Sequence, residues 1–196
     1  MSRTKFNISI LGESYVGKTS LVEIITGFDF NPSKIATVGI EHSFLNKEFD
    51  GKMRRFQIFD TAGQEKYQSL SASTIQVADG YILVFDVGRK NTLELINKWI
   101  KYINEYVEVD KKVIILIGNK IDIENREISE EEGKKFAQSK NFKYFETSAK
   151  DNIGVEKAFN EIIKDIYELN KNLEKDTINI EDKPKRKKFF CSCSKK

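Results

Sequence analysis

The sequence predicts a three-layer α/β fold, in which a mostly parallel β-sheet is covered by helices on both faces. Short apolar runs alternate with segments whose apolar residues return at helical spacing, and this alternation is typical of parallel strands joined by helices. A glycine-containing run directly after the first apolar segment also favours a strand that turns sharply into a helix. The 196 residues, 39% of them hydrophobic, are enough for one buried core and too few for two ordinary domains.

Each strand is predicted from a short apolar run. The predicted strands cover residues 6–11, 42–45, 56–59, 81–85, 113–117 and 144–145. The second and third enclose a turn over residues 46–52. Within this turn the step Asp50-Gly51 favours a β-hairpin, so one edge of the sheet is expected to be antiparallel.

Helices are predicted between the strands, over residues 18–26, 92–106, 129–139 and 155–172. Asn91 and Ser129 are of the residue types that cap helix N-termini, and each precedes a predicted helix. In the last helix apolar residues return about every four positions, so one face should dock on the sheet. Beyond Asn172 the chain is polar and charged and contains Pro184, which predicts a folded domain over 1–172 and a flexible tail over 173–196.

The charge of the chain is unevenly distributed. Residues 183–196 hold six Lys and one Arg without any acid, and subtracting these seven charges from the net +3 leaves −4 for the rest. A nucleic-acid-binding domain would carry its positive charge on the folded body, so that class is disfavoured. A basic tail on an acidic body is instead suited to an anionic membrane surface.

Both cysteines, Cys191 and Cys193, lie in this tail, so no disulfide framework can hold the body together and a reducing compartment is expected. No stretch reaches the ~20 apolar residues that span a bilayer, and residues 1–5 do not lead into a secretory apolar segment. We expect an intracellular protein that is soluble unless the tail is modified.

The run from Gly12 to Thr19 matches the pattern G-x-x-x-x-G-K-[S/T] after a predicted strand. Such a loop wraps its backbone N–H groups around a phosphate, while Lys18 supplies a positive charge and Thr19 a hydroxyl for Mg²⁺. An ordinary strand-to-helix turn that happens to contain glycine and lysine is the alternative. The predicted phosphate-binding residues are Ser14, Tyr15, Val16, Gly17, Lys18, Thr19 and Ser20.

Three further runs follow predicted strands. In Asp60-Thr61-Ala62-Gly63-Gln64, the aspartate can hold Mg²⁺ through water, the glycine N–H can meet a terminal phosphate, and Gln64 can orient an attacking water. In Asn119-Lys120-Ile121-Asp122, the Asp122 carboxylate can accept two N–H groups from guanine, which adenine cannot offer. The third run, Thr147-Ser148-Ala149-Lys150, places a backbone N–H near the guanine oxygen. Four such runs in order leave little room for coincidence.

With these runs the chain resembles the small Ras-like GTPases, and among them the Rab branch, over nearly its whole length. The resemblance rests on residues 60–67, 83–86 and 118–122 and on Trp99 in its helix. It implies a P-loop NTPase fold with six strands and about five helices, GTP and GDP as ligands, and Mg²⁺. It also implies that Thr37 reaches Mg²⁺ and the γ-phosphate only in the GTP form, and that Phe30 flanks the guanine.

The resemblance further implies a monomeric switch at the cytoplasmic face of an intracellular membrane, acting in vesicle traffic with an exchange factor, an activating protein and effectors. GTP would hold the two switch segments through Thr37 and Gly63, and hydrolysis would release them. No arginine of the phosphate loop offers an internal catalytic finger, so slow turnover is expected. The rival hypotheses are a GTP-binding scaffold that does not cycle and a P-loop kinase with a small acceptor.

The sequence departs from the Rab pattern in three places. Tyr15 occupies a loop position that is usually small, and an outward ring is favoured over one leaning toward the γ-phosphate. An aromatic trio common in Rab proteins is replaced by His42, Phe59 and Thr74, which puts the usual effectors in doubt. The cysteines are followed by Ser194-Lys195-Lys196 rather than standing at the terminus; their prenylation is predicted, and unmodified thiols are the alternative.

Overall fold

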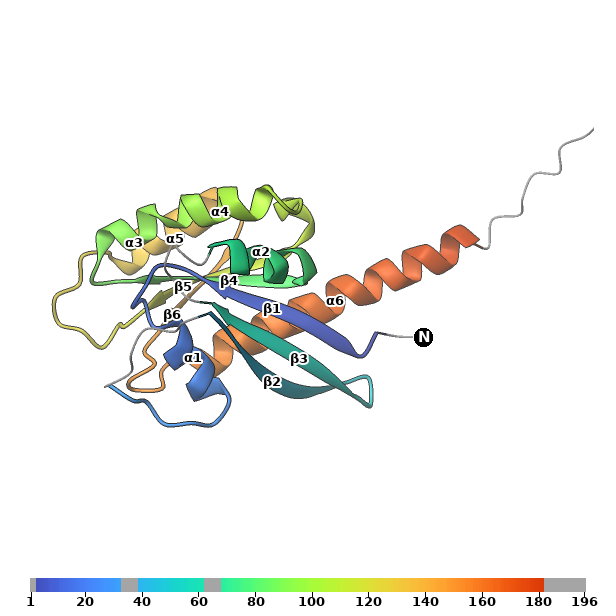
Figure 1. Ribbon diagram of the computed structural model, residues 1–196, viewed down its shortest axis with the longest axis horizontal. Helices are drawn as coiled ribbons and strands as arrows, with labels where there is room; N and C mark the ends of the chain where they lie inside the picture. Colours follow the sequence, from blue (N-terminus) through green and yellow to red (C-terminus); the bar gives the residue numbers. More distant parts are fainter. Residues whose placement is uncertain (1–2, 33–38, 62–67, 182–196) are drawn as a thin grey trace, which may run out of the picture.

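The computed structural model describes residues 3–32, 39–61 and 68–181, and its centre is a six-stranded sheet (Figure 1). The spatial order is β2-β3-β1-β4-β5-β6, and only the pair β2 and β3 is antiparallel. The strands are β1 (Lys5–Leu11), β2 (Ile40–Phe49), β3 (Lys52–Thr61), β4 (Gly80–Asp86), β5 (Val113–Asn119) and β6 (Lys143–Thr147). The predicted mostly parallel sheet with one antiparallel edge is confirmed.

Helices lie on both faces of this sheet, as predicted (Figure 1). On one face are α1 (Lys18–Ile25) and α6 (Val155–Glu181). On the other are α2 (Gln68–Val77), α3 (Lys90–Glu94), α4 (Ile96–Asn104) and α5 (Glu130–Ser139), and a short 3-10 helix, η2 (Val109–Lys111), precedes β5.

Strand β4 shows how one sheet serves two cores. All of its residues are buried, and alternate side chains point to opposite faces. Ile82 and Val84 pack with α1 and α6, whereas Leu83 and Phe85 pack with α2 to α5. A strand buried on both faces is expected to be a continuous apolar run, which is why residues 81–85 could be identified from the sequence.

The β2–β3 hairpin turns more tightly than the sequence predicted. Asp50 and Gly51 both have positive φ, 51° and 68°, as a two-residue type I′ turn requires, so the predicted turn over 46–52 was wrong in extent. The Asp50 carboxylate accepts hydrogen bonds from the Tyr167 hydroxyl, at 2.9 Å, and from Lys171 Nζ, at 2.5 Å. These bonds to α6 hold the end of a hairpin whose two strands are longer than predicted.

The predicted caps had opposite outcomes. Ser129 caps α5 in a capping box, in which its hydroxyl accepts from the Glu132 N–H and the Glu132 carboxylate accepts from the Ser129 N–H. Asn91 is not a cap, because it lies inside α3, which begins at Lys90. The helix predicted over 92–106 is divided into α3 and α4 at Leu95, whose carbonyl accepts from the Lys98 N–H in a tighter turn.

Two other helices were missed in part or in whole. Helix α2, which is rich in Ser, Thr and Gln, was not predicted from the sequence. It is held by buried Ile75, whose carbonyl accepts a hydrogen bond from the Tyr81 hydroxyl. Helix α6 continues to Glu181, nine residues past the predicted end. No glycine or proline interrupts residues 173–181, and polar residues such as Glu and Lys are good helix formers. The domain boundary at residue 172 stays a prediction.

Candidate functional site

The candidate site lies at the edge of the sheet where the parallel strands end and α1 begins. The loop of residues 12–17 connects β1 to α1, and the carboxyl ends of β3, β5 and β6 lie at the same edge of the sheet. Ligands of open α/β sheets bind outside the carboxyl ends of the strands, where neighbouring connections leave in opposite directions. The described residues of the four predicted runs therefore meet at the edge that the fold favours for a ligand.

Two glycines let the loop pack closely against the sheet. A Cβ on Gly12 would stand 2.3 Å from the Val84 carbonyl oxygen, and a Cβ on Gly17 would stand 2.3 Å from Asn119 Nδ2. Their φ angles, 147° and 97°, are also rarely adopted by other residues. Glycine is therefore required at both positions, and the loop presents its backbone at the start of α1.

Lys18 is the first residue of α1 and is only 5% exposed. Its Nζ donates hydrogen bonds to the carbonyl oxygens of Gly12 and Glu13, both at 2.9 Å, so the ammonium lies along the inside of the loop. Burial lowers the pKa of Lys18 to about 8; the charges of Asp60 and Glu13 oppose this shift and that of Arg89 adds to it. A buried cation in this position is suited to an anionic ligand.

Asp60 and Thr19 are the predicted metal ligands within the described residues. The Asp60 carboxylate is 1% exposed and lies near the end of β3, where Asp60 is paired in register with Ile10 of β1. Thr19 follows Lys18 in the first turn of α1. Mg²⁺ is commonly held by one or two protein oxygens, with phosphate oxygens and waters completing the shell, and this donor set fits that pattern. Within residues 3–32, 39–61 and 68–181, no three His, Cys, Asp or Glu side chains gather as a metal site.

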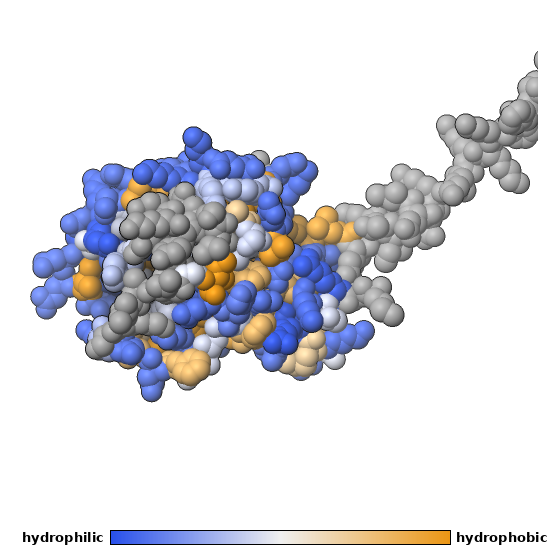
Figure 2. Space-filling view, viewed as in Figure 1, coloured by the Kyte–Doolittle hydropathy of each residue, from blue (hydrophilic) through white to orange (hydrophobic). Residues whose placement is uncertain are grey.

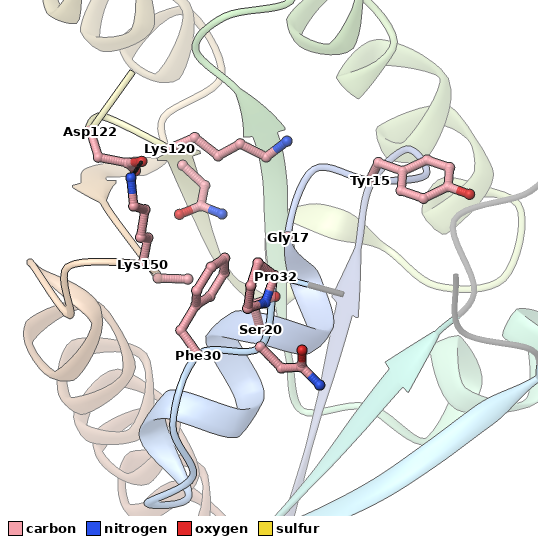
Figure 3. Close-up of a pocket in the computed structure, with 11 residues that line it drawn as sticks. Tyr15, Gly17, Ser20, Phe30, Pro32, Lys120, Asp122 and Lys150 are labelled. Atoms are coloured by element: carbon pink, nitrogen blue, oxygen red, sulfur yellow. Dashed lines mark ion pairs between the residues drawn. The ribbon is translucent and has the colours of Figure 1, made fainter. Parts of the chain in front are cut away.

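A pocket of about 220 Å³ continues from the loop toward the ends of β5 and β6 (Figure 3). At one end, Asp122 Oδ1 accepts a hydrogen bond from Ser148 Oγ at 2.7 Å, and Oδ2 lies 3.9 Å from Lys150 Nζ. Ser148 Oγ in turn accepts from the Asp151 N–H at 3.0 Å. The Asp122 carboxylate is thus oriented by its neighbours at the rim of the pocket.

Asn119 connects the two parts of the site. Its Nδ2 donates to the Val16 carbonyl in the phosphate loop, and its Oδ1 accepts from Thr147 Oγ1 at the end of β6, both at 2.9 Å. Asn119 is 1% exposed. The Asn119 side chain therefore ties the loop to the end of β6, which the motif alone did not reveal.

Lys120 stands in the left-handed region, with φ of 70°, and lines the pocket. Its Nζ lies 2.7 Å from Asp86 Oδ2, at the end of β4. Asp86 was not among the site residues predicted from the sequence. Its position as a carboxylate ending a buried strand was the signal that could have found it.

The other predicted residues fall into three groups. Phe30 is half-buried and lines the pocket, as do Ser20, Ala149 and two residues that sequence reasoning missed, Asn31 and Pro32. Tyr15 is 64% exposed and its ring points away from Asp122 and Lys150, in agreement with the outward orientation favoured from the sequence (Figure 3). The predicted residues outside the described part of the chain are Thr37, Gly63, Gln64, Cys191 and Cys193.

The three positions that replace the aromatic trio do not form an exposed aromatic surface. His42 is exposed, but Phe59 and Thr74 are only 6% and 3% exposed, and the His42 ring contacts the edge of Phe59 with centroids 5.2 Å apart. On the face seen in Figure 2, polar residues predominate and apolar residues are scattered among them. Among the described helices, none combines the length and apolarity that crossing a membrane needs.

The chain is similar to known proteins over most of its length. The profile of the Ras family matches residues 7–168. The Ras-related protein Rab-12 of Mus musculus is 41% identical over 164 residues, which are 83% of this chain and 67% of that protein. The Ras-related protein Rab-18-B of Danio rerio is 38% identical over 165 residues, 84% of this chain and 80% of that protein. The Ras-related protein Rab-18 of Lymnaea stagnalis is 37% identical over 165 residues, which are 84% of this chain and 82% of that protein.

Proposed function

This chain belongs to the Ras family and to its Rab branch, and we propose that the phosphate loop and the pocket beside Asp122 form its binding site for GTP and GDP. The protein is a GTP-binding switch that hydrolyses GTP and regulates membrane traffic. What remains to be assigned is the role of each residue.

The observation that carries the residue assignment is the fixed Asp122 carboxylate at one end of a pocket that has the phosphate loop at its other end. One carboxylate can accept both the ring and the exocyclic N–H of guanine, and adenine offers no such pair. Phe30 and the stem of Lys120 line the same pocket and are placed to pack against a planar base. The loop amides and Lys18 then bind the phosphates.

Thr19 and Asp60 are the described residues that would hold Mg²⁺, with Thr37 as a further predicted ligand. The ion would neutralise charge on the β- and γ-phosphates when bound. Lys18 contributes positive charge at the same phosphates from inside the loop, where burial keeps water away and strengthens the attraction.

We assign hydrolysis to Gln64, which orients the attacking water. We assign the conformational switch to Thr37 and Gly63, which contact the γ-phosphate only in the GTP form. By comparison with Ras, intrinsic turnover is expected on the order of 10⁻⁴ to 10⁻³ s⁻¹ until an activating protein supplies an arginine. An exchange factor and effectors complete the cycle. A GTP-binding scaffold that does not cycle is not favoured, because the chain retains Gln64 in the Ras pattern.

We assign membrane anchoring to the tail of residues 173–196. Prenylation of Cys191, Cys193 or both, together with the basic residues 185–188, would anchor the protein at the cytoplasmic face of an intracellular membrane. The effectors are expected to differ from those that need an exposed aromatic trio, because only His42 of the three replacing residues is exposed.

Calorimetric titration of the nucleotide-free protein with GTP, GDP and ATP, in the presence of Mg²⁺, tests the binding assignment. GTP and GDP should bind tightly and ATP weakly. Removal of Mg²⁺ by a chelator should lower the affinity for GTP. Equal affinity for ATP and GTP would overturn the role of Asp122. Affinity capture from native cells with the GTP-bound and GDP-bound protein would identify the effectors as partners retained by the GTP form alone.

A further inference from the structure

Arg89 lies outside the predicted runs but reaches the phosphate loop. Its Nη2 donates a hydrogen bond to the carbonyl oxygen of Ser14 at 3.0 Å, and its Nε donates to Asp86 Oδ2 at 3.0 Å. One planar guanidinium therefore joins the middle of the loop to the end of β4. The side chain is 39% exposed, so it stands at the outer surface of the loop rather than beneath it.

Asp86 is a rigid anchor for this contact. Its side chain is 5% exposed, its Oδ1 accepts from the Gly88 N–H at 2.9 Å, and Lys120 Nζ lies 2.7 Å from the same Oδ2 that Arg89 contacts. Its backbone N–H donates to the Thr92 hydroxyl oxygen at 3.0 Å. Because Asp86 is held from several sides, it can fix the position of Arg89 and, through it, of Ser14.

We propose that Arg89 is a positioning residue that fastens the phosphate loop to Asp86 and thereby slows the release of bound guanine nucleotide. This inference rests on the proposed nucleotide site. Asp86 then connects both halves of that site, since Lys120 belongs to the base pocket and Ser14 to the phosphate loop.

The energetic reason is that a ligand must hold the loop in one conformation for as long as it stays bound. A loop that is fastened from outside loses less conformational freedom on binding, and its amides stay aimed at the phosphates. Among the described residues, Asn119 also ties this loop, through Val16, and Lys18 does so through Gly12 and Glu13. Neither holds Ser14, so Arg89 supplies a contact that they do not provide.

Arginine is suited to this role because its fork presents two donors in fixed directions, one for Asp86 and one for Ser14. A lysine could replace the charge and one hydrogen bond, but a single ammonium is less able to satisfy both acceptors. The conservative variant should therefore restore part of the effect and not all of it.

The test is the dissociation rate of a fluorescent GDP analogue from the full chain in excess GDP and Mg²⁺. Arg89→Ala should release it about tenfold faster, as expected for the loss of one charge-assisted hydrogen bond. Arg89→Lys should fall between Arg89→Ala and wild type. Lys90→Ala is the matched control, because Lys90 is the exposed cation next in sequence, and it should behave as wild type.

Dissociation of a non-hydrolysable GTP analogue should accelerate by the same factor, because the contact is to the loop and not to the γ-phosphate. An unchanged dissociation rate in Arg89→Ala, with the fold intact by circular dichroism, would overturn the proposal. So would slower single-turnover hydrolysis with unchanged dissociation, since Arg89 would then act on the reaction itself. If wild type failed to retain GDP, the nucleotide site itself would be wrong.

Discussion

The side-chain amide of Asn119 donates a hydrogen bond to the carbonyl oxygen of Val16 at 2.9 Å and thereby links the last residue of β5 to the phosphate loop. The two residues are 103 positions apart in the chain. Because Asn119 also accepts from Thr147, three segments of the site depend on one buried side chain.

Asn119→Ala should therefore weaken nucleotide binding even though Lys18 and Asp122 stay in place. It leaves the Val16 carbonyl and the Thr147 hydroxyl buried without their partner, which costs about 1 to 3 kcal/mol for each group. We expect GDP affinity to fall at least about tenfold by calorimetry and the melting temperature to fall with it. Asn125→Ala, in the exposed part of the loop after β5, is the control and should change neither.

Base selection should depend on Asp122. Asp122→Asn replaces one acceptor by a donor, which faces an N–H of guanine, and should cost several kcal/mol of GTP affinity. A xanthine nucleotide, which offers an acceptor at that position, should recover much of the loss. Calorimetry measures the affinities of wild type and variant for the guanine and the xanthine nucleotide. Unchanged GTP affinity in the variant would show that Asp122 does not select the base.

We expect the lipid chains and the basic residues of the tail to make separable contributions to membrane attachment. One lipid chain binds a membrane marginally, whereas two chains, or one chain and a basic run, anchor stably. Replacing Cys191 and Cys193 by serine should send the protein to the cytosol. Neutralising residues 185–188 should leave it on membranes but redistributed, since each charge near an anionic surface contributes about 1 kcal/mol.

Intact-mass analysis of protein from its native cell checks the chemistry of this attachment. We expect the mass of one or two prenyl groups in the membrane fraction. An unmodified mass there would contradict the lipid contribution and leave the basic run as the sole anchor.

The site residues that could be predicted from the sequence are those that follow the end of a strand. Lys18 and Asp122 follow apolar runs, and parallel strands bring such positions to one edge whatever the details of packing. The contact of Arg89 with Asp86 and Ser14 could not be predicted, because it depends on which side chain reaches from the end of β4 to the loop after β1. No spacing in the sequence encodes that contact.

The same distinction holds for the fold. Residues 81–85 were identified as a strand because burial on both faces leaves an unbroken apolar run. Helix α2 was missed because only a few of its residues are apolar and its stability comes from docking Ile75 in the core. The predicted end of α6 lies too early because residues 173–181 are mostly polar, although no glycine or proline among them stops the helix before Glu181.

We propose that hydrolysis of GTP, which ends the active state of this switch, depends on Gln64 to orient the attacking water. The most direct measurement loads wild type and Gln64→Leu with GTP and follows the ratio of bound GTP to GDP under single-turnover conditions in Mg²⁺. Both proteins should bind GTP alike, because the change touches no phosphate contact, and the variant should convert it markedly more slowly. Equal conversion rates, or no conversion by wild type with or without an activating protein, would contradict the account.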